Sequence, residues 1–408
     1  MVLPSLMPDV VSQKDLGKVS LTGGTALAYG NGNTVPQIAL DAALASGTAY
    51  RCLERRTAFL IGTGLPDALA VVPVPGQPGK VWGEFWAELC SQWAYFNGCA
   101  LLIKYANDKS IGEVHLLPLP AVRKTSNGCF LLNHRYGRKG FKADESTEHL
   151  PFNPSTEAVA ALLKQAKVLD KKGKPFGQPG QILYAYIAKA GEMDYPLPPH
   201  WAGLEDVLLD TELSRFDLEE VRNGFLPNAV LTLIGEQDDA TVDENGQSQE
   251  DRTNEMLRGF TGLGNNATGR DKLLVLDAKT KEQAPILTAF NGTGNLDKLD
   301  AKKEAVGQTI CRHIGIPPIL AGFAKAGQLG AAQEILNAVE LTQDDLAPIQ
   351  RKALRVLMAV SPAMAGAVVG VKKPISFLPP EVLAVLTPDE KRKLGGYEPL
   401  TITPAPAP

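Results

Sequence analysis

The sequence lacks the excess of basic residues that is typical of proteins that hold DNA tightly. Its 408 residues include 41 lysines and arginines against 45 aspartates and glutamates, and the formal net charge is −4. A domain that grips phosphates usually carries a clear basic surplus, because each Lys or Arg contact releases counterions and adds affinity. The bulk surface of this chain is therefore not expected to bind DNA firmly.

Paired cysteines and long apolar runs are also missing. The cysteines are odd in number and form no CxxC pair; they are Cys52, Cys90, Cys99, Cys129 and Cys311. This pattern indicates buried thiols in a reducing cytoplasm. The N-terminus has no signal-peptide pattern, and the longest weakly apolar stretch, 356–371, is shorter than the ~20 residues that a bilayer requires. No membrane segment and no membrane partner are expected.

Motifs that suggest chemistry are few, and each fails on a specific point. The glycine-rich segment 262–269 follows a predicted helix and precedes a predicted strand, which reverses the order that a dinucleotide site requires. As a phosphate loop it carries Arg270 and Asp271 where Lys and Ser or Thr belong. The five histidines have no zinc-ligand spacing, and no nucleophile has an evident base. The sequence predicts a protein that is not an enzyme and uses no metal or cofactor.

The first half of the chain contains helical periodicity followed by short strands. Helical patterns cover 37–62 and 82–97, and the second places Trp82, Trp86 and Trp93 on one face, which is typical of a core stripe. Gly98 is the predicted C-cap of that helix. Strands are predicted at 100–105, 114–119, 129–132 and 181–187, with a short helix between 153 and 173.

The second half begins with a continuous helix over 203–223, with Gly224 as its predicted C-cap. A strand, helix, strand, strand unit follows at 229–234, 249–260, 272–278 and 285–290. A further helix covers 296–314, and the paired prolines after it exclude a helix throughout 315–322. The last long helical pattern runs from 331 to 360, with an expected kink at Pro348.

The helix predicted at 203–223 is strongly acidic. Against two arginines it carries seven acids: Glu205, Asp206, Asp210, Glu212, Asp217, Glu219 and Glu220. Taken alone, a charged face of this kind indicates a solvated helix surface. Its sequence neighbourhood favours a second interpretation.

The stretch 195–207, Tyr-Pro-Leu-Pro-Pro-His-Trp-Ala-Gly-Leu-Glu-Asp-Val, and the Arg-Asn-Gly-Phe at 222–225 closely resemble the stem-entry region of portal proteins of long-tailed bacteriophages. Three further pieces follow in the family's order. The helix that ends in Gly-Ile-Pro-Pro-Ile-Leu-Ala-Gly at 315–322 resembles the second stem helix and tunnel loop. Gly-Gln-Leu at 327–329 then leads into a long helix, and 386–400 resembles the family's short C-terminal helical segment.

The resemblance implies an α+β portal fold, with a helix-rich wing and a two-helix stem that carries a small α/β clip, assembled as a ring that usually has twelve subunits. The implied parts are an arm at 1–36, a wing at 37–200, stem helices at 201–225 and 291–315, and a clip at 226–290. A tunnel loop at 316–330 and a long kinked wing helix with its return at 331–375 follow. A short crown-like segment and tail complete the chain at 376–408.

The family's function is to form the DNA channel at one capsid vertex, for genome packaging by the terminase motor and for genome ejection. Carried over to this chain, the tunnel loop would place Ile319, Leu320, Phe323, Lys325 and Gln328 at the channel. The seven acids of the first stem helix would line it. The clip would bind partners through Arg252, Arg258, Arg270 and Lys272.

The implied partners are further copies of the chain, double-stranded DNA, the large terminase, a head–tail adaptor, the major capsid protein and a scaffold. The implied location is the portal vertex of the virion, after assembly in the bacterial cytoplasm. Two alternatives stay open. One is another ring-forming head–tail adaptor or tail component, and the other is a nucleotide-dependent enzyme.

Overall fold

The computed structural model describes residues 26–142, 145–166, 180–188, 194–222, 229–234, 273–278, 293–323, 332–370 and 380–394. The chain forms two compact units. One consists of residues 1–211 and 306–408, and the other of residues 212–305. Helices α6 (Leu204–Arg222) and α8 (Thr293–Ile314) each pass through a boundary between the units.

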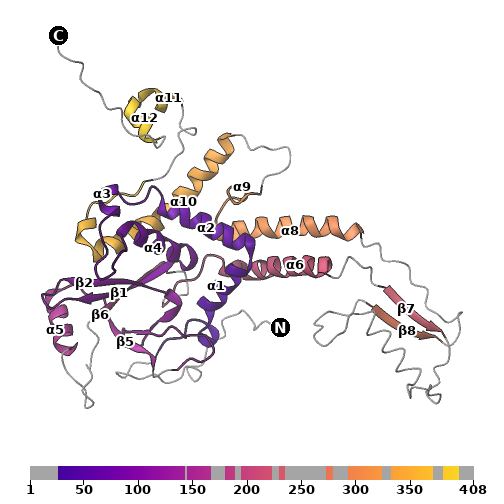
Figure 1. The fold of residues 1–408 in the computed structure, drawn as a ribbon, viewed down its shortest axis with the longest axis horizontal. Coiled ribbons are helices and arrows are strands. Elements are labelled where there is room, and N and C mark those ends of the chain that lie inside the picture. The colour runs from indigo at the N-terminus through magenta and orange to yellow at the C-terminus, as the bar shows by residue number, and fades with distance from the viewer. Residues whose placement is uncertain are drawn as a thin grey trace, which may run out of the picture. The chain divides into compact units, whose positions relative to one another are not determined.

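A six-stranded mixed sheet lies at the centre of the first unit (Figure 1). Its strands are β1 (Gly98–Tyr105), β2 (Ile111–Leu117), β3 (Val122–Lys124), β4 (Phe130–Leu132), β5 (Thr147–Pro151) and β6 (Gly180–Tyr186). In space their order is β2-β1-β6-β5-β4-β3, and every neighbouring pair is antiparallel except β5 with β6. The four strands predicted from the sequence are therefore confirmed, and β3 and β5 are additions.

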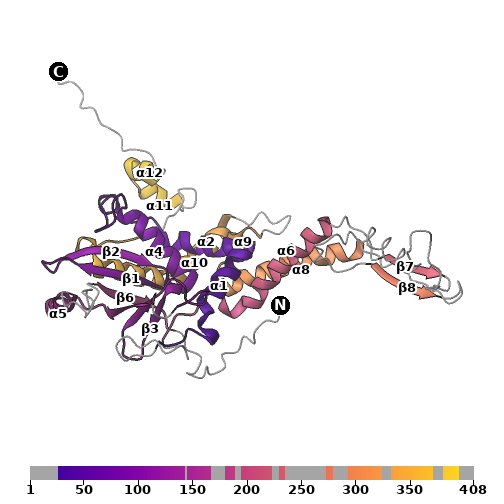
Figure 2. The same ribbon diagram turned by 60° about the horizontal axis from the view of Figure 1, so that its bottom comes forward.

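Helix α4 (Trp82–Phe96) packs on this sheet, where it contacts β1 and β2. Three further helices gather around it: α2 (Gly47–Ile61) contacts α4, α1 (Val35–Ala45) and α10 (Ala332–Val360), and α10 also contacts α4, as can be followed in Figures 1 and 2. Helix α4 contacts β1 directly, and Trp82, Trp86 and Trp93 are almost completely buried. The prediction that the three tryptophans form a core stripe is confirmed. Burying large aromatic side chains contributes most of the favourable free energy of such a core.

Shorter elements complete the first unit. They are α3 (Asp67–Ala70), α5 (Thr156–Ala166), α9 (Pro318–Ala321), α11 (Pro380–Val385), α12 (Pro388–Leu394) and 3₁₀ turns at Asn31–Asn33, Leu119–Ala121, Trp201–Gly203 and Pro362–Met364. The first 25 residues of the predicted arm lie outside the described residues. The rest of it is packed, since the Tyr29 ring stacks on the Tyr195 ring with 4.3 Å between centroids.

Two boundaries differ from the sequence prediction. The pattern at 37–62 is two helices rather than one, because Ser46 leaves the helical conformation (ψ 116°) and its hydroxyl accepts a hydrogen bond from the Ala49 N–H at 3.1 Å. The cap of α4 is Asn97, which adopts the left-handed conformation (φ 57°), and not Gly98. Gly98 starts β1, where a Cβ would lie 2.9 Å from the Ala185 carbonyl oxygen.

The second unit contains the later part of α6, the first part of α8, and strands β7 (Ala229–Ile234) and β8 (Leu273–Ala278). The two strands pair in parallel from Ala229 opposite Leu273 to Ile234 opposite Ala278. A parallel pair of strands needs a crossover connection rather than a tight hairpin turn. The predicted helix at 249–260, the strand at 285–290 and the Gly224 cap lie outside the described residues.

The long C-terminal helix agrees with its predicted range. Helix α10 runs from Ala332 to Val360 with Pro348 inside it. Within the described residues, no helix combines the length and apolar character that crossing a bilayer demands.

Candidate functional site

The two predicted stem helices, α6 and α8, lie antiparallel. In the first unit Asp206, near the start of α6, pairs with His313, near the end of α8, with 3.2 Å between Oδ2 and Nε2. The backbone at the start of α6 lies very close to α8 there, because a Cβ on Gly203 would lie 2.3 Å from the His313 ring. In the second unit Lys303 of α8 forms an ion pair with Asp217 of α6. These contacts join opposite ends of the two helices, as a two-helix stem requires.

Several of the predicted channel acids have partners inside the subunit. Asp210 accepts hydrogen bonds from the Ser46 hydroxyl at 2.6 Å and the Thr48 N–H at 3.4 Å, so its carboxylate lies at the N-terminus of α2, where the helix dipole favours negative charge. Glu212 accepts from Arg215 Nη1 at 2.8 Å on an exposed surface. Glu205 is exposed, and the side chains of Glu219 and Glu220 lie outside the described part. A channel-lining role for the set remains a prediction.

The end of α8 has a defined turn. Gly315 adopts a left-handed conformation (φ 80°), and the N–H groups of Gly315 and Ile316 both donate to the Cys311 carbonyl at 3.0 Å. This arrangement ends a helix and satisfies its last carbonyls. The Ile316 side chain is 1% exposed, so the turn is anchored in the core.

The predicted tunnel loop is partly helical. The paired prolines do not prevent structure here, because Pro318 occupies the first turn of α9, where its missing N–H costs nothing. The Phe323 N–H donates to the Pro318 carbonyl at 3.0 Å. Residues 318–321 of the predicted tunnel loop at 316–330 therefore form a short helix, and no helix runs throughout 315–322.

The tunnel-loop side chains within the described residues are packed. Ile319, Leu320 and Phe323 are each partly buried, and α9 contacts both α2 and α10. The Phe323 ring lies on α8 at Gly307, where a Cβ would come within 2.4 Å of the ring. Lys325 and Gln328 lie outside the described residues, as do the four predicted clip residues Arg252, Arg258, Arg270 and Lys272.

A buried arginine holds the end of α8. Arg56 of α2 is 7% exposed, donates from Nη1 to the Ile314 carbonyl at 3.0 Å and donates from Nη2 to Asn97 Oδ1 at 2.6 Å. The negative end of the α8 dipole stabilises the guanidinium. Burial lowers the pKa of Arg56 to about 10, so the group stays charged at neutral pH.

Sequence reasoning did not single out Arg56, although a signal was present. Leu53, Arg56, Thr57 and Leu60 follow the three- and four-residue spacing of one buried helix face. A charged residue on such a face needs a specific partner. The partner is a carbonyl 258 residues away, which no local pattern indicates.

A pair of thiols also joins α2 to α8. The Sγ atoms of Cys52 and Cys311 lie 3.4 Å apart, and both cysteines are free and buried. The hydrogen bond to Cys311, together with burial, raises the pKa of Cys52, so this thiol keeps its proton. The expectation of buried thiols is confirmed for four of the cysteines, and Cys129 is partly exposed. In the part of the chain that the structure describes, no three His, Cys, Asp or Glu side chains gather as a metal site.

Comparisons with known proteins give no family model and no curated protein that matches this chain. Solved structures do match. The neck of an empty gene transfer agent (GTA) particle is 15% identical, with coverage of 94% of this chain and 98% of that chain and a TM-score of 0.49. The virion of the native GTA particle is 14% identical, with coverage of 95% and 100% and a TM-score of 0.46.

An HK97-family phage portal protein from Corynebacterium diphtheriae also matches. It is 13% identical, with coverage of 85% of this chain and 98% of that chain and a TM-score of 0.36. This last structure carries the name of the class that the sequence resembles. Identities of 13–15% with TM-scores below 0.5 carry no conclusion about function, which has to come from the residues of this chain.

Proposed function

We propose that this chain is a portal subunit, which forms the DNA channel at one capsid vertex as part of a ring. The observation that carries the proposal is the antiparallel pair α6 and α8, with the parallel strands β7 and β8 between them in the sequence. The stem resemblance in the sequence requires this order of elements. The exposed apolar surface on α6 supports assembly into a ring.

That surface belongs to the second unit, where Phe216 and Leu218 are 47% and 48% exposed. Water contact with apolar surface costs about 25 cal/mol for each Å². Residues two apart point to opposite sides of a helix, so the two neighbours of a subunit in a ring, one on each side, would cover the two side chains and remove this cost. A ring repeats the contact at every subunit boundary, and we propose a ring of twelve.

The proposed channel guides DNA without holding it. Strong phosphate contacts would resist sliding, and a chain with a net charge of −4 avoids them. Glu205 and any other acid that faces the channel would be repeated around the ring and repel the duplex. Lys325 and Gln328 complete the proposed tunnel loop.

The proposed partners follow from the same role. The clip, through Arg252, Arg258, Arg270 and Lys272, would bind the large terminase during packaging and a head–tail adaptor afterwards. The wing would contact the major capsid protein and a scaffold. The subunit would assemble in the bacterial cytoplasm and remain at the portal vertex of the virion, where the genome also leaves.

Mass photometry and negative-stain images of the purified protein test the proposal. We expect rings with a central hole, and the double variant F216S/L218S should require about tenfold more protein to form them. Val71→Ser is the matched control, because Val71 is 68% exposed and lies outside α6. A monomer mass for the wild-type chain across a wide concentration range would contradict the proposal.

A ring-forming head–tail adaptor or tail component is the second candidate, because exposed apolar helix surface also suits that role. Rings alone do not separate the two. DNA packaging does, since only a portal supports terminase-driven filling of proheads that lack their own portal. Failure of such packaging, with intact rings, would favour the adaptor.

A further inference from the structure

Charge is divided along one face of α10. Its first half carries the acids Glu334, Glu340, Asp344 and Asp345, and its second half carries the cations Arg351, Lys352 and Arg355. All seven side chains are exposed. At 100° per residue, Leu341, Asp345, Pro348, Lys352 and Arg355 fall on one stripe. The acidic half and the basic half therefore follow each other on the same side of the helix.

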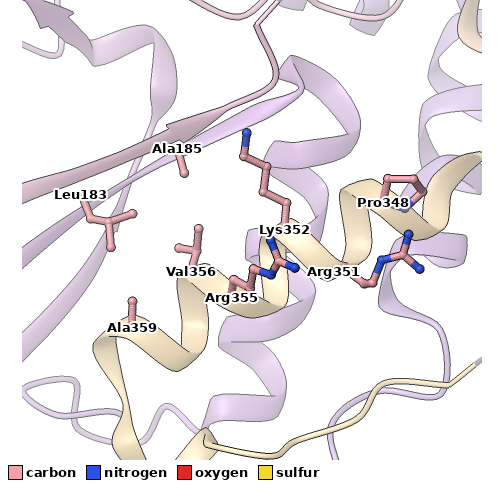
Figure 3. A pocket seen from close by; sticks show the side chains of 8 residues that line it. All are labelled: Leu183, Ala185, Pro348, Arg351, Lys352, Arg355, Val356 and Ala359. Atoms are coloured by element: carbon pink, nitrogen blue, oxygen red, sulfur yellow. The ribbon is translucent and has the colours of Figure 1, made fainter.

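The basic half lines a groove with an apolar floor. The groove has a volume of about 580 Å³ and lies between α10 and β6. Figure 3 shows Leu183 and Ala185 on the strand side and the cationic side chains, with Val356 and Ala359, on the helix side. Among the described residues that line it there are three cations and no carboxylate. Such a groove suits a ligand that presents an apolar group beside negative charge.

The acidic half of α10 presents that combination. Leu341 is 60% exposed, although it is a large apolar side chain. Asp344 and Asp345 lie three and four residues after it, which places both beside Leu341 on the helix surface, and Glu334 lies two turns before it on the same side of the helix. The result is an apolar knob flanked by carboxylates. Its apolar side chain suits the apolar floor of the groove, and its negative charge suits the three cations there.

One copy cannot join its own two halves, because they occupy consecutive parts of the same helix face. A second copy can. We propose that the groove at Arg351, Lys352 and Arg355 of one copy receives the acidic half of α10 from a second copy, with Leu341 on the apolar floor. The inference rests on the proposed function in one respect: it names a contact between neighbouring subunits of the ring.

The contact would be head to tail. The donor and the acceptor are different surfaces of the same chain, so two copies that engage one donor with one acceptor each keep the other surface open, and the contact repeats. A heterologous contact of this kind closes into a ring when the rotation between copies permits it. Desolvated apolar contact at Leu341 would provide affinity, and the charges would fix which surfaces meet.

Charge reversal on each side tests the contact. The groove variant is R351E/R355E, and the acidic variant is D344K/D345K. The control K139E/K164E makes the same change in charge as the groove variant, at two exposed lysines outside α10. By mass photometry at low salt, each α10 variant should need about tenfold more protein than wild type or control to form rings.

The decisive samples combine the two reversals. In an equimolar mixture, the negative groove of one variant can bind the positive knob of the other. At the next boundary a wild-type groove meets a wild-type knob, so rings should form again in the mixture. The quadruple variant R351E/R355E/D344K/D345K should also recover. Circular dichroism melts check that each variant folds. If a reversal prevents folding, the neutral variants R351Q/R355Q and D344N/D345N replace it, and their coupling in a double-mutant cycle gives the same information.

The possible results separate the inference from the proposed function. Wild-type rings with folded α10 variants that assemble equally well would overturn the inference and leave the portal role intact. Loss of rings that neither the mixture nor the quadruple variant recovers would show that the groove and the acidic half of α10 do not pair with each other, which also overturns the inference. A wild-type chain that forms no ring would remove the proposed function together with the contact.

Discussion

Two buried histidines link the stability of the first unit to pH. His200 is 1% exposed and its Nε2 lies 2.9 Å from the Ala39 carbonyl, and His149 is 6% exposed on β5. Burial is the main cause that lowers the pKa of both. A histidine with a lowered pKa takes up its proton more readily in the unfolded chain than in the folded one.

The sign of the effect follows directly. As pH falls below the ordinary histidine pKa of about 6.5, the unfolded chain binds protons first and the folded state loses stability. We expect the free energy of unfolding to drop by about 1 kcal/mol for each histidine between pH 7.5 and 5.5, as measured by urea denaturation. The H149Q/H200Q variant should lose this component. His134→Gln, at an exposed position, is the control, and an equal pH slope in all three proteins would refute the assignment.

At the same scale, Arg123 illustrates what the sequence does not reveal. It lies in β3 and is completely buried, donates to the Asn33 carbonyl at 3.0 Å, and has its guanidinium 4.7 Å from the Tyr136 ring centroid. In the sequence, Val-Arg-Lys at 122–124 has too few residues and too much charge for a strand pattern. Its partners come from a segment 90 residues earlier and from a later turn, so local periodicity could not predict β3.

Long helices in which apolar residues recur at regular spacing were predicted well. Helices α4 and α6 match their predicted ranges closely, because repeated three- and four-residue spacing is visible in the sequence. The break between α1 and α2 was missed, although Ser46 followed by Gly47 is a recognisable N-cap signal. Strand β5 was missed because Leu150 is its one large apolar residue, which gives no alternating pattern. Its partner β6 also lies about 30 residues later in the sequence and pairs with it in parallel.

The contact between Gly307 and Phe323 gives a prediction for α8. Alanine normally stabilises a helix interior by about 1 kcal/mol relative to glycine. Here a Cβ would come within 2.4 Å of the Phe323 ring, so the ring must leave its position. We expect Gly307→Ala to gain less stability in the wild-type chain than in a Phe323→Ala background. A double-mutant cycle from chemical denaturation measures the difference.

A coupling of about 1 kcal/mol between the two positions is the expected result. Gly203 provides no equivalent control, since its neighbour is His313. Gly47 does, because nothing lies within 4 Å of a Cβ there and Gly47→Ala should show no coupling to Phe323. Additive effects at 307 and 323 would mean that the ring does not rest on α8 in solution.

At the scale of the whole molecule, the resemblance supplied what composition could not. Length, charge and cysteine content excluded a tight DNA binder and a secreted disulfide protein, yet they are shared by many chains. The order of the stem helix, strand pair, second helix and Pro-Pro turn is specific, and each of these elements is present. The channel, clip and ring assignments involve other molecules or residues outside the described part, so they remain predictions.

The acidic channel can be tested on assembled rings. Glu205 is exposed, and a ring would repeat it at every subunit. If it faces the channel, Glu205→Lys places a ring of positive charge against the duplex, where each phosphate contact favours a stalled state. We expect normal assembly, DNA binding that weakens steeply with salt, and slower packaging. Lys164→Glu and Glu157→Lys on α5 serve as surface controls. Packaging of E205K at the wild-type rate in low salt would place Glu205 away from the channel.

Helix α2 also has a mechanical consequence. At its start Ser46 donates to Asp210 of α6, and Arg56 donates to the last carbonyl of α8, at Ile314. Ten residues separate the two attachment points along the chain, a span of about 15 Å in a helix that is stiff against tension and compression. A pulling force applied to α6 at Asp210 would therefore be transmitted along α2 to the end of α8. Under such a force, the hydrogen bonds from Ser46 to Asp210 and from Arg56 to the Ile314 carbonyl would break before helix α2 itself.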